Sequence, residues 1–287
     1  MSAPPRIDGG NIVFRTRTSA SELESVSPLM VGQIGRSAVG FRFEGETGIP
    51  GVEFAPVSVA DTSGTTRASA SGAFGLVVRL QGLGVSDSNN EALVVGTPDG
   101  LRIVAREGSQ APGDSAGAVI RAMGTGNTWH ADVSGWALSS TGRVALTTPV
   151  SRAGQPSFAS HSGAYSDVSG ELALVARGNH GTWGQGTPVE GWAVHMLDGA
   201  ARITPGGTVA AAALFDSPSP QSGGVVVKAA GGPERLASLQ EVPGLPGVRI
   251  NREWQNGIAV GLNGRGDVAT GTRLLNQSAQ PIGSAVV

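Results

Sequence analysis

One short pattern recurs along this chain at nearly constant intervals and constrains the fold more than any other feature. A glycine, one variable residue and a β-type apolar residue open the runs "TGRVALTT" (141–148), "GGTVAAAAL" (206–214) and "RGDVATGT" (265–272). Two earlier runs open in a similar way, and the five anchor glycines are Gly10, Gly72, Gly142, Gly207 and Gly266. Their intervals are 62, 70, 65 and 59 residues, so we predict repeats of about 64 residues.

Each repeat contains short apolar segments separated by turn-forming residues. Segments such as "ALVVG" (92–96), "LRIVAR" (101–106) and "GVVVKA" (224–229) are rich in β-branched residues, which favour strands. The Asp-Gly of "GTPDG" (96–100) is typical of a hairpin turn. Only "PERLASLQEV" (233–242) has a helical appearance, and its counterparts in other repeats have strand patterns. We therefore predict three or four antiparallel strands per repeat.

A sheet of three or four strands has an apolar face that it cannot bury alone. Such sheets stacked around an axis form a β-propeller, in which neighbouring sheets cover one another. We predict an all-β chain that folds as a single repeat domain over residues 1–287, a β-propeller of about five blades. The first blade is expected to lack its lead-in strand and the last its closing strand. A four-bladed ring and an open repeat array are the alternatives.

The composition agrees with a protein of strands and turns and limits the kinds of partner and site that we expect. The 287 residues include 45 Gly and 17 Pro, yet 39% are apolar, which favours a packed core over disorder. The net charge is -2 and Lys228 is the only lysine, so we expect no nucleic-acid partner. The chain has no cysteine and no apolar run long enough for a transmembrane segment. We expect no cofactor.

Two segments resemble a repeat of a known protein family. "LRIVAREGSQAPG" (101–113) and "ELALVARGNHG" (171–181) are each followed by a G-x-V-A strand. They resemble the tandem-repeat proteins of planctomycetes and myxobacteria, whose repeat reads VAREG-x-x-APG and then N-x-x-G-x-V-A-F. The resemblance covers nearly the whole chain and is strongest over residues 101–146. It implies a propeller-like, extracellular or surface-associated protein without assigned chemistry.

Tryptophans are the leading candidates for a ligand-binding surface. The segments "NTWHADVSGW" (127–136) and "HGTWGQGTPVEGW" (180–192) place Trp beside hydrogen-bonding side chains. Such a combination suits sugar rings, which have apolar faces and polar rims. The alternative is that these aromatic rings fill the seams between blades. The candidate ligand-binding residues are Trp129, His130, Trp183, Trp192 and Trp254.

Three short motifs have an ordinary structural explanation beside a functional one. In "DSNNE" (87–91), oxygen-bearing side chains alternate in a loop and form a weak calcium candidate, comprising Asp87, Asn89 and Glu91. "GDSAG" (113–117) matches a G-x-S-x-G nucleophile elbow but follows a turn rather than a buried strand. Arg265-Gly266-Asp267 matches an adhesion tripeptide, although the repeated turn already requires Gly266.

From these observations we predict a non-enzymatic interaction module, located outside the cell or on its surface. It would bind a protein or a glycan through loops on one face of the propeller. One alternative is a structural or assembly protein of a virion or cell envelope, which would associate with itself. Another is a hydrolase with its site at the mouth of the channel, although paired carboxylates do not recur in the repeats.

Overall fold

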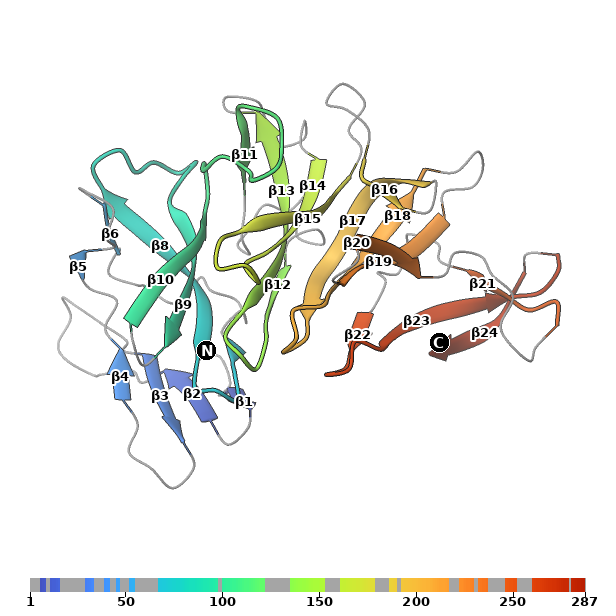
Figure 1. The fold of residues 1–287 in the computed structure, drawn as a ribbon, viewed down its shortest axis with the longest axis horizontal. Coiled ribbons are helices and arrows are strands. Elements are labelled where there is room, and N and C mark those ends of the chain that lie inside the picture. The colour runs from blue at the N-terminus through green and yellow to red at the C-terminus, as the bar shows by residue number, and fades with distance from the viewer. Residues whose placement is uncertain are drawn as a thin grey trace.

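The computed structural model describes most of the chain as strands and turns. The described residues are 6–8, 11–15, 29–33, 39–41, 45–46, 52–54, 67–97, 100–121, 135–152, 161–178, 186–189, 192–216, 222–229, 232–236, 246–251, 260–278 and 280–286. None of them forms a helix long and apolar enough to cross a membrane. Their strands form five antiparallel sheets that follow one another side by side (Figure 1). The all-β prediction is confirmed, whereas a closed propeller ring is not shown.

The first two sheets contain ten strands. The first sheet has the order β1-β2-β3-β4, comprising β1 (Arg6–Asp8), β2 (Asn11–Arg15), β3 (Leu29–Gln33) and β4 (Val39–Phe41). The second has the order β10-β9-β8-β6-β5, and β7 also pairs with β8. Its strands are β5 (Gly45–Glu46), β6 (Val52–Phe54), β7 (Arg67–Ala68), β8 (Phe74–Gly82), β9 (Glu91–Thr97) and β10 (Gly100–Arg106).

The other three sheets contain five, five and four strands. The third sheet comprises β11 (Ala118–Ile120), β12 (Gly135–Leu138), β13 (Val144–Arg152), β14 (His161–Ser166) and β15 (Ala173–Arg177). The fourth comprises β16 (Pro188–Val189), β17 (Trp192–Ile203), β18 (Val209–Phe215), β19 (Ser222–Ala229) and β20 (Gly232–Leu236). The fifth comprises β21 (Arg249–Asn251), β22 (Val260–Leu262), β23 (Val268–Leu275) and β24 (Pro281–Val286).

Four of the sheets share one plan around a long strand that follows an anchor glycine. These strands are β8, β13, β18 and β23, and each pairs with the lead-in strand before it and with the strand after it. The first sheet also has a lead-in strand, because β1 pairs with β2, so the expectation that it lacks one is wrong. The segment 233–242 begins in β20, a strand rather than a helix.

Four anchor glycines occupy the same tight turn. Their φ values are 85°, 78°, 83° and 92°, a left-handed conformation that favours glycine, at Gly72, Gly142, Gly207 and Gly266. In each turn the glycine N–H donates to the carbonyl three residues earlier, at 3.0–3.1 Å, and the acceptors are Ser69, Ser139, Thr204 and Asn263. In three of the turns the side-chain oxygen of that residue also accepts a backbone N–H. Gly10 lies outside the described residues.

The same turn accounts for the Arg265-Gly266-Asp267 tripeptide. The Asp267 N–H donates to the side-chain oxygen of Asn263 at 2.9 Å, and Asn263 Nδ2 donates to the Asp267 carboxylate at 2.7 Å. The Arg265 side chain donates to the same carboxylate at 3.0 Å. Both charged side chains therefore contact their own turn.

The central strands of the third and fourth sheets are buried on both faces because each of these sheets packs between two neighbours. In β13, Val144 and Leu146 contact the second sheet, whereas Ala145 contacts the fourth. Alternate residues of a strand point to opposite faces, so a sheet covered on both sides needs a continuous apolar run. This requirement explains "VAAAALF" in β18, where every residue is buried. We call the packed space between two neighbouring sheets a seam.

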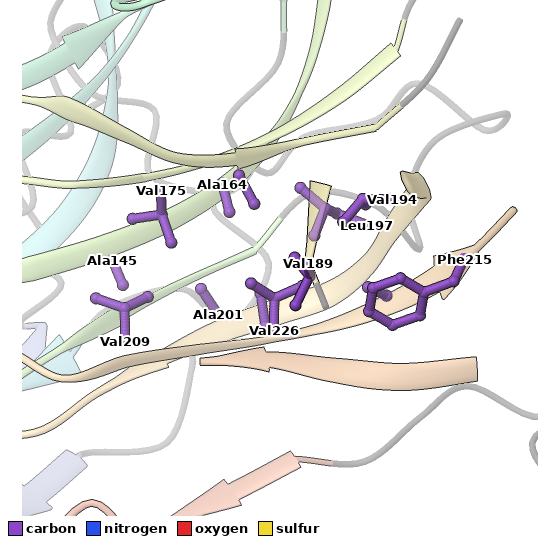
Figure 2. Close-up of a cluster of buried hydrophobic side chains, with 13 residues drawn as sticks. Ala145, Ala164, Val175, Val189, Val194, Leu197, Ala201, Val209, Phe215 and Val226 are labelled. Carbon is purple, nitrogen blue, oxygen red and sulfur yellow. The ribbon is translucent and has the colours of Figure 1, made fainter. Parts of the chain in front are cut away.

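Small side chains allow the third and fourth sheets to approach closely. Figure 2 shows this seam, in which Ala145 and Ala164 of the third sheet pack near Ala201 and Val209 of the fourth. Phe215 packs at one end of the cluster. Small and large side chains of this kind fill much of the space between the two sheets.

Trp136 fills the seam between the second and third sheets. Its side chain comes from β12 and is 2% exposed. The ring lies on Gly75 of β8, where an added Cβ would come within 2.7 Å of the indole. The guanidinium of Arg67 lies 6.0 Å from the ring centroid. A glycine on one sheet thus makes room for a tryptophan from the next.

We expect Gly266→Ala to lower the free energy of unfolding by about 1–2 kcal/mol, because alanine is strained at this positive φ. The matched control is Gly264→Ala in the same turn, where an added Cβ meets nothing within 4 Å and no positive φ is imposed. Urea denaturation of both variants measures the difference. Equal stabilities would contradict the assignment of the anchor turn.

Candidate functional site

The seam between the third and fourth sheets contains a cavity of about 380 Å³, which we call the seam pocket. One wall comes from β14, β15 and their hairpin, comprising Ser166, Val168, Ser169, Ala173, Leu174 and Val175. The other comes from an anchor turn, β18 and β19, comprising Gly206, Gly207, Thr208, Val209, Lys228 and Ala229. The volume lies within the range of roughly 300–1,000 Å³ that is usual for small-molecule sites.

Two small residues shape this pocket. Ala173 is the first residue of β15 and presents only a methyl group. Gly207 lets the side chain of Val168 lie against the anchor turn, because an added Cβ would come within 2.6 Å of Val168 Cγ1. Val168 is 41% exposed, and Ala173 is also exposed, so the pocket opens to solvent on this side.

The lining combines apolar walls with one positive charge. Leu174, Val175 and Val209 supply apolar surface, and Ser166 and other hydroxyl residues supply polar groups. Lys228 is half-buried, and its Nζ donates to the Leu174 carbonyl at 3.2 Å. An ammonium group carries three N–H bonds, so two remain for a ligand. Among the residues that the structure describes, Lys228 forms no ion pair.

An ion pair spans the preceding seam, between the second and third sheets. Arg102 of β10 donates to the Asp167 carboxylate and to the Gly142 carbonyl, the latter at 3.3 Å. The Asp167 side chain is 1% exposed and also accepts the Val144 N–H. The pair therefore connects the outer strand of one sheet to the anchor turn and central strand of the next.

A second ionic cluster holds the "GDSAG" turn against the third sheet. Asp114 accepts from His161 Nε2 at 2.8 Å and from Arg177 Nη1 at 3.2 Å. Burial alone would raise the pKa of Asp114, but the hydrogen bond and charge of His161, with smaller contributions from Ser115 and Arg177, hold it below its ordinary value. The Asp114 and His161 side chains are each 2% exposed, so the cluster fixes the turn.

The buried residue of "GDSAG" is therefore Asp114 and not Ser115, which is exposed. The motif lies in a turn between β10 and β11 and is followed by a strand. A nucleophile elbow needs a strand before the serine and a helix after it. The structure thus contradicts the elbow interpretation of this motif.

Two carboxylates come together at the end of the second sheet. The Glu107 N–H donates to the Glu91 carbonyl at 2.8 Å, and Glu91 is buried. Burial, followed by the negative charge of Glu91, raises the pKa of Glu107 to about 7, against the smaller opposing influence of Arg121. The folded chain therefore keeps a proton on Glu107 at a pH where an ordinary glutamate has lost it.

The residues of the weak calcium candidate have local partners in this structure. The side-chain oxygen of Asn89 accepts the Ser86 N–H at 2.7 Å, which closes the hairpin tip. Asp87 is exposed and accepts from Asn90 at 3.4 Å. Glu91 is buried at the start of β9, beside Glu107. Local turn chemistry thus explains these residues, as Asn and Asp side chains commonly bond to nearby backbone.

Most of the predicted ligand-binding residues cannot be placed. Trp129, His130, Trp183 and Trp254 lie outside the described residues. Trp192 begins β17, and its side chain is not among those described. The tryptophan pattern therefore contributes nothing to the site that the structure shows.

The seam pocket was missed because it depends on pairing between distant strands. Its walls come from residues 166–175 and 206–229, and neither segment carries a binding motif. One signal was available, since Lys228 is the only lysine and lies in an otherwise apolar run. A charge in a strand that is covered on both faces indicates a site or a partner.

Comparisons with known proteins identify a family but no activity. Residues 8–285 match the model of a family of unknown function, DUF7453. No curated protein matches the chain. An exo-β-1,3-galactanase from Phanerochaete chrysosporium matches at 11% identity and a TM-score of 0.32, over 99% of this chain and 63% of that one. A polysaccharide lyase of family PL25, an ulvan lyase, matches at 10% identity and a TM-score of 0.35, over 98% and 68%.

These comparisons correct the predicted function. Both of these solved structures are enzymes that act on carbohydrates, whereas we expected an interaction module that binds a protein or a glycan through its loops. That prediction is withdrawn. The galactanase and lyase structures are too distant, at TM-scores of 0.32 and 0.35, to assign an activity or substrate to this chain.

We expect Asp167→Asn to cost about 2–3 kcal/mol of stability, because Arg102 then loses its charged acceptor within a largely buried seam. Asp87→Asn at the exposed hairpin tip is the control and should cost less than about 0.5 kcal/mol. The unfolding midpoint in urea measures both effects. A loss at Asp167 no larger than that at Asp87 would show that this ion pair does not stabilise the seam.

The pKa of Glu107 predicts a dependence of stability on pH. The unfolded chain releases this proton near pH 4.5 and the folded chain near pH 7, so stability falls as pH rises between these values. We expect Glu107→Gln to remove this slope and to stabilise the protein at pH 8 by about 1–2 kcal/mol, after allowance for solvent screening. Glu171→Gln, in an exposed turn, should retain the slope. Thermal unfolding from pH 4 to pH 8 provides the test.

Proposed function

We propose that this chain, which belongs to the DUF7453 family of unknown function, binds a small organic molecule in the seam pocket. The observation that carries the proposal is an open cavity of about 380 Å³ at the seam between the third and fourth sheets, lined by apolar side chains and by the ammonium group of Lys228. Concave and mostly apolar surfaces of this size, with a few polar groups, are typical of small-molecule sites. A bound molecule would cover this apolar surface and displace water from it.

The lining also has the composition of a binding site. Apolar side chains such as Leu174 and Val209 can bury the body of a ligand, whereas Ser166, Thr208 and Lys228 can orient its polar groups. The walls belong to two sheets that are held by their own hydrogen-bonded strands, so the site is formed before the ligand arrives. Such preorganisation lowers the entropic cost of binding.

The proposal includes the larger architecture in which the pocket lies. The five sheets act as blades of a single propeller-like repeat domain over residues 1–287, as the resemblance to the planctomycete and myxobacterial repeat proteins implies. An extracellular or surface location, self-association and the absence of catalysis stay predictions.

A fragment screen by ligand-observed NMR tests the proposed function. We expect fragments to bind the wild type with dissociation constants near the millimolar range that is usual for molecules of this size. Ala173→Phe should weaken their binding by about tenfold or more, because the ring occupies the pocket. Ala116→Phe, which adds the same ring at an exposed site outside the pocket, should leave binding unchanged.

Two results would contradict the proposal. One is a screen in which no fragment binds the wild-type chain. The other is a set of fragments that bind Ala173→Phe as well as they bind the wild type, since their site would then lie elsewhere. Circular dichroism and the unfolding midpoint establish that both phenylalanine variants are folded.

A further inference from the structure

We propose that the ligand of the seam pocket is a small organic carboxylate, held by Lys228 at the place where the preceding seam carries an ion pair. This inference rests on the proposed function and adds the chemical class of the ligand. It comes from a comparison of two seams of the same chain, position by position.

The register of the strands makes two positions equivalent on the outer strands. In the second sheet, Gly75 lies three residues after the anchor glycine. It pairs with Val95, which in turn pairs with Arg102. Three residues after the next anchor, Ala145 pairs with Ser166, which pairs with Ala173. Arg102 and Ala173 therefore hold the same place in the second and third sheets.

The residues on the opposite walls of the two seams are also equivalent when they are counted from the anchor glycines. In the third sheet, Val144 lies two residues after the anchor glycine, and its carbonyl accepts the Asp167 N–H at 3.1 Å. Two residues after the following anchor, Val209 pairs with Lys228. Asp167 and Lys228 therefore hold the same place in the third and fourth sheets.

The two seams differ at both positions. In the preceding seam, the long side chain of Arg102 reaches the Asp167 carboxylate and fills the space beside the anchor turn. In the seam with the pocket, Ala173 replaces the arginine and leaves that space open. Lys228 replaces the aspartate, so the charge on the opposite wall changes from negative to positive. The seam with the pocket therefore has no arginine at this position, and its lysine can pair with an anion from outside the chain.

Electrostatics favours an anionic occupant. A charged group within a seam is stabilised when an opposite charge lies beside it, because burial removes part of its hydration. In the preceding seam the chain supplies that opposite charge itself. In this seam a ligand can supply it, because Lys228 Nζ bonds only to the Leu174 carbonyl among the described residues and has N–H groups to spare.

The lining indicates a monocarboxylate rather than a phosphate. Tight phosphate sites usually combine several cations or backbone N–H groups, whereas one lysine matches the single charge of a carboxylate. Leu174, Val175 and Val209 form an apolar wall next to Lys228, and this wall suits a carboxylate with an apolar body. The hydroxyls of Ser166 and Thr208 lie within the same lining.

Three probes of similar size and different charge test the inference, namely benzoate, benzamide and benzylamine. We expect benzoate to bind wild-type protein about tenfold more tightly than benzamide, and benzylamine not to bind, because only benzoate pairs with the ammonium group. Lys228→Met should reduce benzoate binding to the level of benzamide. Lys228→Arg should retain the preference for benzoate. Ligand-observed NMR measures the dissociation constants.

A double variant provides a structural control. Ala173→Arg with Lys228→Asp rebuilds the arginine–aspartate pair of the preceding seam in the pocket. We expect this variant to be folded, with an unfolding midpoint no lower than that of the wild type, and to bind none of the three probes. Lys228→Asp alone should keep the cavity and change the preference from benzoate to benzylamine.

The outcomes separate the two proposals. If benzoate and benzamide bind equally, and Ala173→Phe abolishes both, the pocket binds ligands but the carboxylate inference is wrong. Unchanged benzoate binding to folded Lys228→Met would also overturn it. If no probe binds the wild type, the inference fails, and the fragment screen decides the proposed function.

Discussion

The packing of one sheet against the next is the constraint on which the rest of this structure depends. A sheet of four to six short strands has two faces, and here both faces of the central sheets are apolar and covered. The anchor turn sets where each central strand starts, since its glycine adopts a positive φ that other residues adopt only with strain. Because the turns are alike, Arg102 and Asp167 in one seam hold the same positions as Ala173 and Lys228 in the next.

Variation within this common frame gives the seams their different properties. Trp136 on Gly75 and the Arg102–Asp167 pair close the seam between the second and third sheets. Small residues such as Ala145 and Ala201 close much of the next one, but Ala173 and Lys228 leave its anchor end open. Two substitutions between equivalent positions thus separate a structural ion pair from a candidate binding site. The inner strands need not change, because the charge and the space both lie at the ends of the strands.

The sequence predicts the periodic part of this protein and misses what differs between its units. Glycine spacing and β-branched runs lead to the all-β class and to the shared turn at Gly142 and Gly207, because both are local properties. The Asp114–His161 contact joins residues 47 apart, and the pocket needs Ala173 and Lys228 on different sheets, so only the pairing of strands brings these residues together. The tryptophan pattern pointed toward loops, whereas the described tryptophan side chain, Trp136, is buried in a seam.

Lys228 also provides the most direct measurement of the central claim. Because it is the only lysine in the chain, uniformly labelled lysine in an untagged protein gives one side-chain ammonium signal by NMR. The account predicts that this signal shifts in a saturable way when benzoate is added and stays still when benzamide is added at the same concentration. An unmoved signal at benzoate concentrations well above the millimolar range would contradict it, since no carboxylate would then reach the seam.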